Sequence, residues 1–371
     1  MFLKFHKNQK LAGNITRSNL NSKIKIPVIS PLIEFSVRKR SMKKIFFSTF
    51  LFMSVSCSSY KPYPYPCSKI EGIPGPEDFV WIEKENIFLI SSHNRRKFES
   101  YGEIYSYNPD TDKIQIIERI DEPEGLSFRP HGIDYKETFL FVILHGDTPD
   151  TNWHAVAIYE YKNNQLIFRK LFQNPLIYSP NDLVAISESE FIITNDMKNR
   201  GSNFELITTF LLGIKRGSLV YCNIQKNQCY KIFEGLGFPN GLALYKNKLF
   251  VSATLENKIY EFDLLSKNNQ YRLENKRQVA KIPGPDNLIL HKNKLYMASH
   301  PSMWKFVQHS KNAEKYSPSM GFEIDPETHE VKKIFEDSGQ KINAASVIMK
   351  INYELFLGQV FNHYLLRCSL K

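Results

Sequence analysis

Short hydrophobic runs alternate with polar turns along most of the chain, from residue 67 to the end. The runs are rich in β-branched and aromatic residues, which is typical of strands. Six of them recur about every 50 residues, and a repeat of roughly that length in a strand-rich chain is typical of a β-propeller. We therefore predict an all-β fold, a six-bladed β-propeller spanning residues 67–371. The six runs are residues 87–92, 138–143, 191–194, 248–253, 294–299 and 354–358.

Between these runs lie four pairs of acidic, amide or glycine residues and one histidine motif, 46 to 59 residues apart. This spacing predicts that one loop of each blade reaches the central channel. Oxygen ligands from several blades would then surround one axis, which is how a hard cation such as Ca²⁺ is bound. A single pair of this kind is also common in turns and caps, and we expect Asn240-Gly241 in a tight turn. The markers are Glu77-Asp78, His131-Gly132-Ile133, Asn181-Asp182, Asn240-Gly241 and Asp286-Asn287.

Two histidines are candidates for acid–base chemistry. His131 and His145 flank one predicted strand, so both could lie near one mouth of the channel. A histidine is the usual base for activating water at neutral pH, and a second one can orient it. Alone, each would more often be a core or loop residue. The sequence lacks the G-x-S-x-G, H-E-x-x-H, C-x-x-C and P-loop motifs, which argues against a serine nucleophile.

One segment departs from the strand pattern. Residues 204–214 are too apolar for an ordinary surface loop. They are expected to form either a helix over the channel mouth, acting as a lid or a membrane-facing patch, or a buried strand of blade three.

The net charge of +11 is concentrated at the N-terminus. Residues 1–56 contain 11 lysine and arginine residues and one acid, Glu34, which leaves +1 for residues 57–371. A nucleic-acid-binding protein would carry this charge on its folded part, so we expect no nucleic-acid partner.

The N-terminal segment resembles an export signal. Residues 42–56 contain two lysines, an apolar run and small residues before Cys57. Met42 directly precedes the lysines, so we expect residues 1–41 to be a disordered upstream extension; a genuine long basic N-terminus is the alternative. Cys57 resembles a lipoprotein acceptor cysteine, although Ser54 departs from that pattern, and a lipid there would anchor the protein to a membrane. Residues 57–66 are proline-rich and predict an extended tether.

The remaining cysteines fit an exported protein. Cys67 and Cys368 lie at the two ends of the predicted propeller, and pairing of the first strand with the last blade would bring them together. Cys222 and Cys229 flank a predicted hairpin turn, where they would either form a disulfide across the strands or remain free thiols.

Seven motifs between Cys67 and Cys368 resemble the serum paraoxonase/arylesterase family. They are Gly75-Pro76-Glu77-Asp78, Arg129-Pro130-His131-Gly132-Ile133, Ser179-Pro180-Asn181-Asp182-Leu183-Val184-Ala185, Phe191 to Asp196, Phe238-Pro239-Asn240-Gly241, Pro285-Asp286-Asn287 and Ser299-His300-Pro301. The resemblance implies a calcium-dependent lactonase on a six-bladed propeller. The chain differs from the family at residues 93–97, which are basic here, and at Ser299, where the family has a free cysteine.

The resemblance also implies roles for individual residues. It implies that His131 and His145 are the water-activating dyad, that Cys67 and Cys368 form a disulfide, and that residues 196–215 form a lid helix. It implies two Ca²⁺ ions, a catalytic one and a structural one bound by Asp78, Asp182 and the backbone carbonyl of Ile133. The implied ligands of the catalytic ion are Glu77, Asn181, Asn240, Asp286 and Asn287, and the implied pocket wall is Phe238, Val360 and Phe361.

The sequence therefore predicts a calcium-dependent hydrolase of lactones and aryl esters, exported and membrane-anchored or secreted. Two alternatives remain. One is a related propeller enzyme of the gluconolactonase or strictosidine-synthase type, with one metal or none. The other is an anchored propeller that binds a small molecule without catalysing a reaction.

Overall fold

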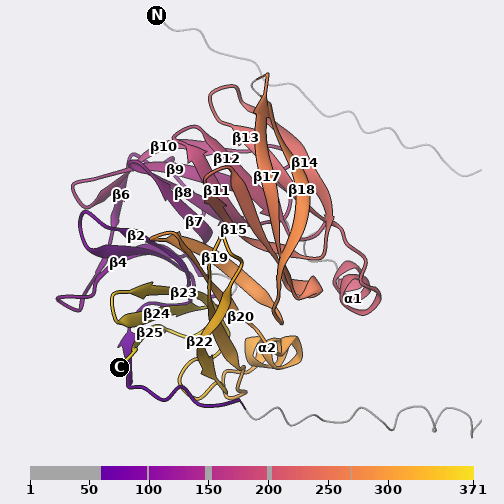
Figure 1. The fold of residues 1–371 in the computed structure, drawn as a ribbon. Coiled ribbons are helices and arrows are strands. Elements are labelled where there is room, and N and C mark those ends of the chain that lie inside the picture. Colours follow the sequence, from indigo (N-terminus) through magenta and orange to yellow (C-terminus); the bar gives the residue numbers. More distant parts are fainter. Residues whose placement is uncertain (1–59, 98–99, 147–152, 199–202, 269) are drawn as a thin grey trace, which may run out of the picture. The chain divides into compact units, whose positions relative to one another are not determined.

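The computed structural model describes residues 60–97, 100–146, 153–198, 203–268 and 270–371. Six β-sheets surround a central axis (Figure 1), so the predicted six-bladed propeller is confirmed. The predicted leader, signal peptide and Cys57 lie outside the described residues. Blade one comprises β2 (Pro76–Ile82), β3 (Ile87–Ser92), β4 (Glu103–Asn108) and β5 (Lys113–Ile116), and blade two β7 (Pro130–Lys136), β8 (Phe139–His145), β9 (His154–Lys162) and β10 (Gln165–Phe172), with β6 (Glu118–Ile120) at its rim.

The four remaining blades repeat the same antiparallel order from the channel to the rim. Blade three comprises β11 (Pro180–Ser187), β12 (Glu190–Asn195), β13 (Gly217–Asn223) and β14 (Gln228–Leu236), and blade four β15 (Pro239–Tyr245), β16 (Lys248–Ala253), β17 (Lys258–Lys267) and β18 (Gln270–Lys281). Blade five comprises β19 (Pro285–His291), β20 (Lys294–Ser299), β21 (Ser319–Ile324) and β22 (Val331–Asp337), and blade six β23 (Ala345–Ile351), β24 (Glu354–Gln359), β25 (Tyr364–Ser369) and β1 (Cys67–Glu71).

The six runs predicted from the hydrophobic pattern are the second strands of the six blades. These strands lie between two neighbours of their own blade and between two other blades, so they are almost entirely buried; every residue of β3 is buried. The rim strands are polar and partly exposed, as β5 and β14 illustrate. The hydrophobic pattern was strongest at these strands because they are buried on both faces.

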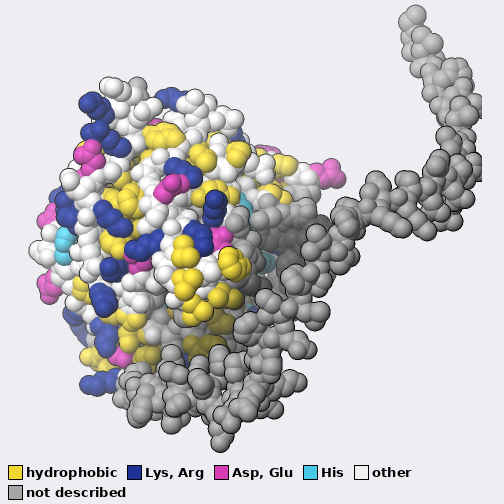
Figure 2. Space-filling view, turned by 90° about the vertical axis from the view of Figure 1, so that its right-hand side faces the viewer, with side chains coloured by type: hydrophobic (Ala, Val, Ile, Leu, Met, Phe, Trp, Pro, Cys, Tyr) yellow, Lys and Arg dark blue, Asp and Glu magenta, His cyan; other side chains and the backbone are white. Residues whose placement is uncertain are grey.

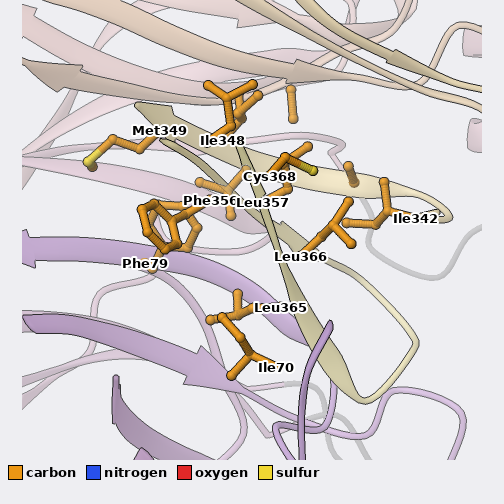
Figure 3. Close-up of a cluster of buried hydrophobic side chains, with 14 of the residues drawn as sticks. Ile70, Phe79, Ile342, Ile348, Met349, Phe356, Leu357, Leu365, Leu366 and Cys368 are labelled. Atoms are coloured by element: carbon orange, nitrogen blue, oxygen red, sulfur yellow. The ribbon is translucent and has the colours of Figure 1, made fainter. Parts of the chain in front are cut away.

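The ring is closed by the N-terminal strand. β1 pairs with β25 in the last blade, with Cys67 opposite Cys368, and the two cysteines form a disulfide. Behind this junction lies a core formed by both chain ends, in which Ile70 packs with residues of β24 and β25 (Figure 3). Strands from the two ends of the chain therefore complete one blade, and β1 covers the otherwise free edge of β25.

The second disulfide joins Cys222 and Cys229 at directly opposed positions of β13 and β14. Of the two expectations for this pair, the bridge across the hairpin is present. Disulfides persist in oxidising compartments, which fits an exported protein.

Two helices follow second strands, α1 (Asn203–Leu212) after β12 and α2 (Met303–Lys311) after β20. Both lie on the same side of the propeller (Figure 1, right). Residues 204–214 are therefore mainly helical and not a buried strand of blade three. Phe204, Leu211 and Leu212 are largely exposed on α1, and Figure 2, viewed from this side, shows hydrophobic side chains gathered on this face among lysine and arginine side chains. Within the described residues, no helix has the length and hydrophobicity needed to span a bilayer.

Two sequence-based expectations need correction. Asn240-Gly241 does not lie in a tight turn but follows Pro239 within strand β15, and the other predicted markers likewise lie on inner strands and not in loops. The described end of the predicted tether is docked on the propeller: Tyr63 is buried, its ring lies 5.0 Å from that of Phe335, and its hydroxyl donates to the Ser369 carbonyl. An aromatic residue in a proline-rich segment gains more from burial than from remaining solvated.

Candidate functional site

Each inner strand carries an irregularity at the same position. The register with the second strand shifts directly after the first residue of β2, β7, β11, β15, β19 and β23. A β-bulge of this kind redirects a side chain, and bulges are common beside active sites. We call the residues at the six shifts the bulge residues; they are Glu77, His131, Asn181, Asn240, Asp286 and Ser346.

Five of the six bulge residues contact another bulge residue at the end of the channel, and Asn181 contacts Asp196 instead. Glu77 Oε2 lies 3.7 Å from His131 Nδ1, and the Ser346 hydroxyl donates to the Glu77 carbonyl at 2.6 Å. The Asn240 amide donates to an Asp286 carboxylate oxygen. Five blades thus deliver side chains that were predicted from sequence, and the sixth adds Ser346.

Four buried oxygens of this site have no hydrogen-bond partner among the described residues. They are Glu77 Oε2, Asn181 Oδ1, Asn240 Oδ1 and Asn287 Oδ1. Leaving a buried acceptor unpaired costs about 1–3 kcal/mol, so a group of four requires an explanation. The amide nitrogens of these residues are engaged: Asn287 Nδ2 donates to Glu77 Oε1 at 3.0 Å and Asn181 Nδ2 to Asp196 Oδ2 at 3.3 Å. The amides therefore direct oxygen inward, as ligands of a hard cation do.

The electrostatics of the site also fit a cation. Burial, with Asp286 as a further contributor, raises the pKa of Glu77 to about 7 although Arg95 opposes the shift. Burial and neighbouring carboxylates raise the pKa of Asp78 and of Asp182. A bound divalent cation would hold these carboxyls ionised. Among the described residues, histidines, cysteines and carboxylates alone form no metal-holding group of three, so a cation site here would require the amide oxygens as ligands.

Asp78 and Asp182 hold neighbouring inner strands together. Asp78 Oδ2 accepts from the amide of Ile133 at 2.8 Å, and Asp182 Oδ2 accepts from the amide of Leu242 at 2.7 Å. Each carboxylate thereby joins one blade to the next. The residues that precede Ile133 and Leu242 are glycines because there is no space for a side chain. A Cβ on Gly241 would lie 2.4 Å from the Leu288 backbone nitrogen.

A cavity of about 240 Å³ lies along the inner strands beyond these aspartates. Asp78, Asp182 and Ile133, the three residues predicted for a structural Ca²⁺, all line it. Asp134 lines it as well, and burial raises the pKa of Asp134 to about 6. The cavity therefore contains three carboxylates, one more than the sequence predicted.

The histidines form a chain of three rings. The His131 and His145 ring centroids are 4.9 Å apart, so the structure brings the predicted pair together. His145 Nδ1 lies 3.0 Å from Nδ1 of His154, which is directly opposite on β9. His154 was not predicted, because its sequence position gives no sign of the β8–β9 register. One of the two Nδ1 atoms must carry the proton that joins them, which fixes the orientation of the His145 ring.

Two further residues contact the proposed ligands. His300 Nε2 lies 2.6 Å from Asp286 Oδ2, and Ser179 donates to Asp196, which in turn accepts from Asn181. Such partners fix the orientation of ligating side chains. Both residues belong to motifs quoted from the sequence, but their roles could be assigned only from their contacts.

The predicted pocket residues lie at the ends of strands on this side of the propeller. Phe361 packs between Phe306 of α2, at 5.4 Å, and the Arg96 guanidinium, at 5.0 Å. Val360 precedes it in the loop after β24. Phe238 has a left-handed backbone, with φ of 59°, which is a strained conformation for a bulky residue.

The basic loop of residues 93–97 reaches the bulge residues. Arg95 Nη2 lies 3.1 Å from His131 Nδ1 and 3.6 Å from Glu77 Oε2. Its neighbour Arg96 points elsewhere and donates to the Asn362 side chain and to the His309 carbonyl of α2. The sequence showed that this loop is basic but not which arginine enters the site.

This geometry defines a propeller with an oxygen-rich polar site at one end of its channel. The family model described as Arylesterase matches residues 75–370, and the chain belongs to this family. Serum paraoxonase/arylesterase 2 of Gallus gallus is 24% identical over 330 residues, covering 82% of this chain and 88% of its own. Serum paraoxonase/arylesterase 1 of Homo sapiens is 22% identical over the same lengths.

Two solved structures share the fold. A luciferin-regenerating enzyme aligns with a TM-score of 0.52 and 13% identity, over 82% of this chain and 95% of its own. The calcium-binding protein regucalcin of Agrobacterium tumefaciens aligns with a TM-score of 0.52 and 9% identity, over 83% and 95%. At these identities the likeness shows the fold alone.

Proposed function

We propose that this protein is a calcium-dependent hydrolase of lactones and aryl esters. The observation that carries the proposal is the group of four buried, unpaired oxygens at the bulge of the inner strands, beside the Asp286 carboxylate. Membership of the arylesterase family supports the same activity. Ca²⁺ would be held by Glu77, Asn181, Asn240, Asp286 and Asn287.

The bound ion would supply the Lewis acidity that polarises the substrate carbonyl and stabilises the oxyanion. The protein itself would hold the ligands in a fixed orientation and exclude water from them. Asp286 is fixed by His300 and Asn240, and Asn287 by Glu77. Because these side chains are buried and mutually bonded, they need little rearrangement when the reaction begins.

His131 is the proposed general base. Its Nδ1 faces the ring of oxygens, 3.7 Å from Glu77 Oε2, so this nitrogen would take the proton from the attacking water. His145 packs against the His131 ring and is itself oriented by His154. The proton moves from water to His131 while the hydroxide adds to the carbonyl carbon, and it is returned to the leaving alkoxide or phenoxide.

A structural Ca²⁺ is proposed for the cavity lined by Asp78, Asp182 and Ile133. Export and membrane association are proposed as well. The exposed apolar residues of α1, among them Phe204 and Leu211, would lie against a lipid surface. Lipidation of Cys57 would provide a second attachment, since two weak signals bind a membrane more stably than one.

The enzyme assay measures hydrolysis of phenyl acetate and γ-butyrolactone with excess Ca²⁺ and with excess chelator. We expect activity that chelation abolishes and Ca²⁺ restores. Full activity in chelator would refute the calcium scheme, and absence of hydrolysis with tight Ca²⁺ binding would favour a binding protein.

Asp286→Ala should abolish binding of one of two Ca²⁺ ions in calorimetry. A single exchangeable ion in the unmodified protein would instead favour an enzyme of the gluconolactonase type.

A further inference from the structure

A second group of buried oxygens lies at the junction of blades five and six, outside the set of proposed calcium ligands. Its members are Asp337 Oδ1, Gln359 Oε1 and Ser317 Oγ, none of which has a hydrogen-bond partner among the described residues. All three side chains are fully buried. Since a buried polar atom without a partner is costly, three of them at one junction require an explanation.

Strand register shows that Asp337 points from blade five toward blade six. Ser319 lies directly opposite Asp337, and directly opposed residues of an antiparallel pair point to the same face of the sheet. The Ser319 hydroxyl accepts from the amide of Ala345, the first residue of blade six, at 3.0 Å. Ala345 in turn lies directly opposite Gln359. The face that carries Asp337 is therefore packed against the blade that carries Gln359.

Tyr364 connects the two sides of this junction. Its hydroxyl donates to the Lys341 carbonyl at 3.0 Å, and the Lys341 amide donates to Asp337 Oδ2 at 2.9 Å. The Gln359 side chain donates to the Tyr364 carbonyl at 2.7 Å. Burial raises the pKa of Tyr364, the Gln359 side chain opposes the shift, and the charge of Asp337 adds to it. Asp337 and Gln359 thus both act on the same hydroxyl.

Ser317 is fixed to the same loop, residues 338–344, which joins β22 to β23. Its amide donates to Asn343 Oδ1 at 2.7 Å, and its carbonyl accepts from the Ala344 amide at 3.4 Å. The loop therefore contacts Ser317 and Asp337 directly and Gln359 through Tyr364. The three oxygens converge where this loop crosses from one blade to the next.

The Asp337 carboxylate has no ion-pair partner among the described residues. Its Oδ2 accepts from three amides of the loop at 2.8 to 3.3 Å, which stabilises a carboxylate. The Lys341 side chain does not balance the charge, because it donates to the carbonyls of Tyr63 and Tyr65. Buried charges are normally paired or bound to a metal. A water molecule would supply hydrogen bonds but no opposite charge.

We propose that a monovalent cation, Na⁺ or K⁺, binds to Asp337 Oδ1, Gln359 Oε1 and Ser317 Oγ at the junction of blades five and six. One carboxylate and two neutral oxygens balance a single positive charge, whereas a calcium site draws on more carboxylates. The ion joins blade five to the blade that β1 closes. It would therefore stabilise the closed ring and take no part in hydrolysis.

Thermal unfolding in different salts tests this proposal. With Ca²⁺ saturating and ionic strength constant, we expect the Tm in about 200 mM NaCl or KCl to exceed that in choline chloride by about 2 °C or more, because an ion that binds only the folded protein stabilises it. Asp337→Asn keeps an acceptor for the loop amides but removes the charge. Gln359→Met keeps the volume but removes Oε1. Both variants should lose the difference between salts.

Asp325→Asn is the matched control. Asp325 also accepts from amides of a loop in blade five, but it is paired with Lys294. This variant should keep the difference between salts. Equal Tm values of the unmodified protein in all three salts would overturn the proposal, as would an unchanged difference in Gln359→Met, which decides the question if Asp337→Asn does not fold.

A titration separates a bound ion from a general effect of salt. When NaCl or KCl replaces choline chloride at constant ionic strength, Tm should rise and approach saturation, as mass action requires for a single site. A rise of the same form in Gln359→Met would show a general salt effect and would overturn the proposal. Hydrolysis is not measured here, so this site and the proposed enzymatic activity can fail independently.

Discussion

His131 illustrates how neighbours assign a role to one residue. Its ring lies against His145, while its Nδ1 faces Glu77 and Arg95. A histidine in such contact with a carboxylate, a guanidinium and a second imidazole is not an ordinary core residue. The partners of this ring come from blade one, blade two and the loop after β3. Its role therefore depends on how these segments are packed against one another.

Substitution of His131 separates catalysis from metal binding. In His131→Gln, kcat should fall by roughly a hundredfold or more, the usual contribution of a general base. Affinity for Ca²⁺ should change by less than about threefold, because His131 is not among the proposed ligands. Steady-state kinetics and calcium titration measure the two quantities. Parallel loss of both would count against its role as base.

His93 makes the loop of residues 93–97 sensitive to acid. Burial and the neighbouring Arg95 lower the pKa of His93 from 6.5 to about 4. Between these values the unfolded chain binds a proton that the folded protein does not, so stability falls as the pH drops from about 6.5 to 4. We expect His93→Gln to lose about 1–2 kcal/mol less over this range than the unmodified protein. Urea unfolding at several pH values measures the slope; His363→Gln, at an exposed position, is the control, and equal slopes in all three proteins would contradict the prediction.

At the scale of the element, the inner strand is the functional unit of this fold. Each one shifts register directly after its first residue and then continues as a strand, with a second shift only in β11. The bulge turns the first side chain of the pair toward the channel end, while the second side chain contacts the next blade, as Asp78 and Asp182 do. Two adjacent residues thus determine both the placement of a proposed ligand and the contact between neighbouring blades.

Substitution of Gly241 tests whether the placement of the proposed ligands is linked to the contact between blades. In Gly241→Ala the new methyl would meet the backbone of Leu288 and Asp286, which cannot yield as a flexible side chain can. We expect a loss of about 2 kcal/mol or more in unfolding free energy from overpacking, together with weaker Ca²⁺ binding as Asp286 is displaced. Gly125→Ala, where a methyl meets nothing within 4 Å but φ is 76°, should cost only about 1 kcal/mol and leave binding unchanged. Unaltered calcium affinity in Gly241→Ala would disprove the coupling.

Pattern-based prediction succeeded where a feature is repeated and failed where it is not. Five of the six bulge residues were found because proline, acid, amide or histidine recurs there. Ser346 was missed, since Ala344-Ala345 replaces the motif. Arg95 and His154 were missed for another reason. The conformation of a loop decides what Arg95 contacts, and the register of two strands decides what His154 contacts. Neither can be predicted from the local sequence. The helical state of residues 204–214 stayed open because an apolar segment of that length fits a helix and a buried strand equally well.

At the scale of the whole molecule, stability depends on closing the ring. β1 contributes a single strand, yet it completes blade six and joins residues 301 positions apart through Cys67 and Cys368. The Cys222–Cys229 bridge, by contrast, spans only 7 positions within one hairpin. The two disulfides therefore constrain the unfolded chain to very different extents.

Removing each disulfide should show this difference. In the chain-entropy account the long bridge contributes about 5–6 kcal/mol and the short one about 2–3 kcal/mol. Cys67→Ser/Cys368→Ser should therefore lower the free energy of unfolding about twice as much as Cys222→Ser/Cys229→Ser. Reversible denaturant unfolding of both double variants with Ca²⁺ present makes the comparison. Equal losses would show that ring closure depends on strand pairing and the core, and not on the covalent link.

The six register shifts also bear on how such a molecule changes over evolutionary time. The backbone of every blade places one bulge residue at the same end of the channel, so exchanging a single residue would alter the proposed coordination chemistry without altering the scaffold. In the sixth blade this position holds Ser346, whose hydroxyl donates to the Glu77 carbonyl and which is not among the proposed ligands. Exchanging residues among the six bulge positions would let related chains bind different ions, or none, while keeping the same architecture.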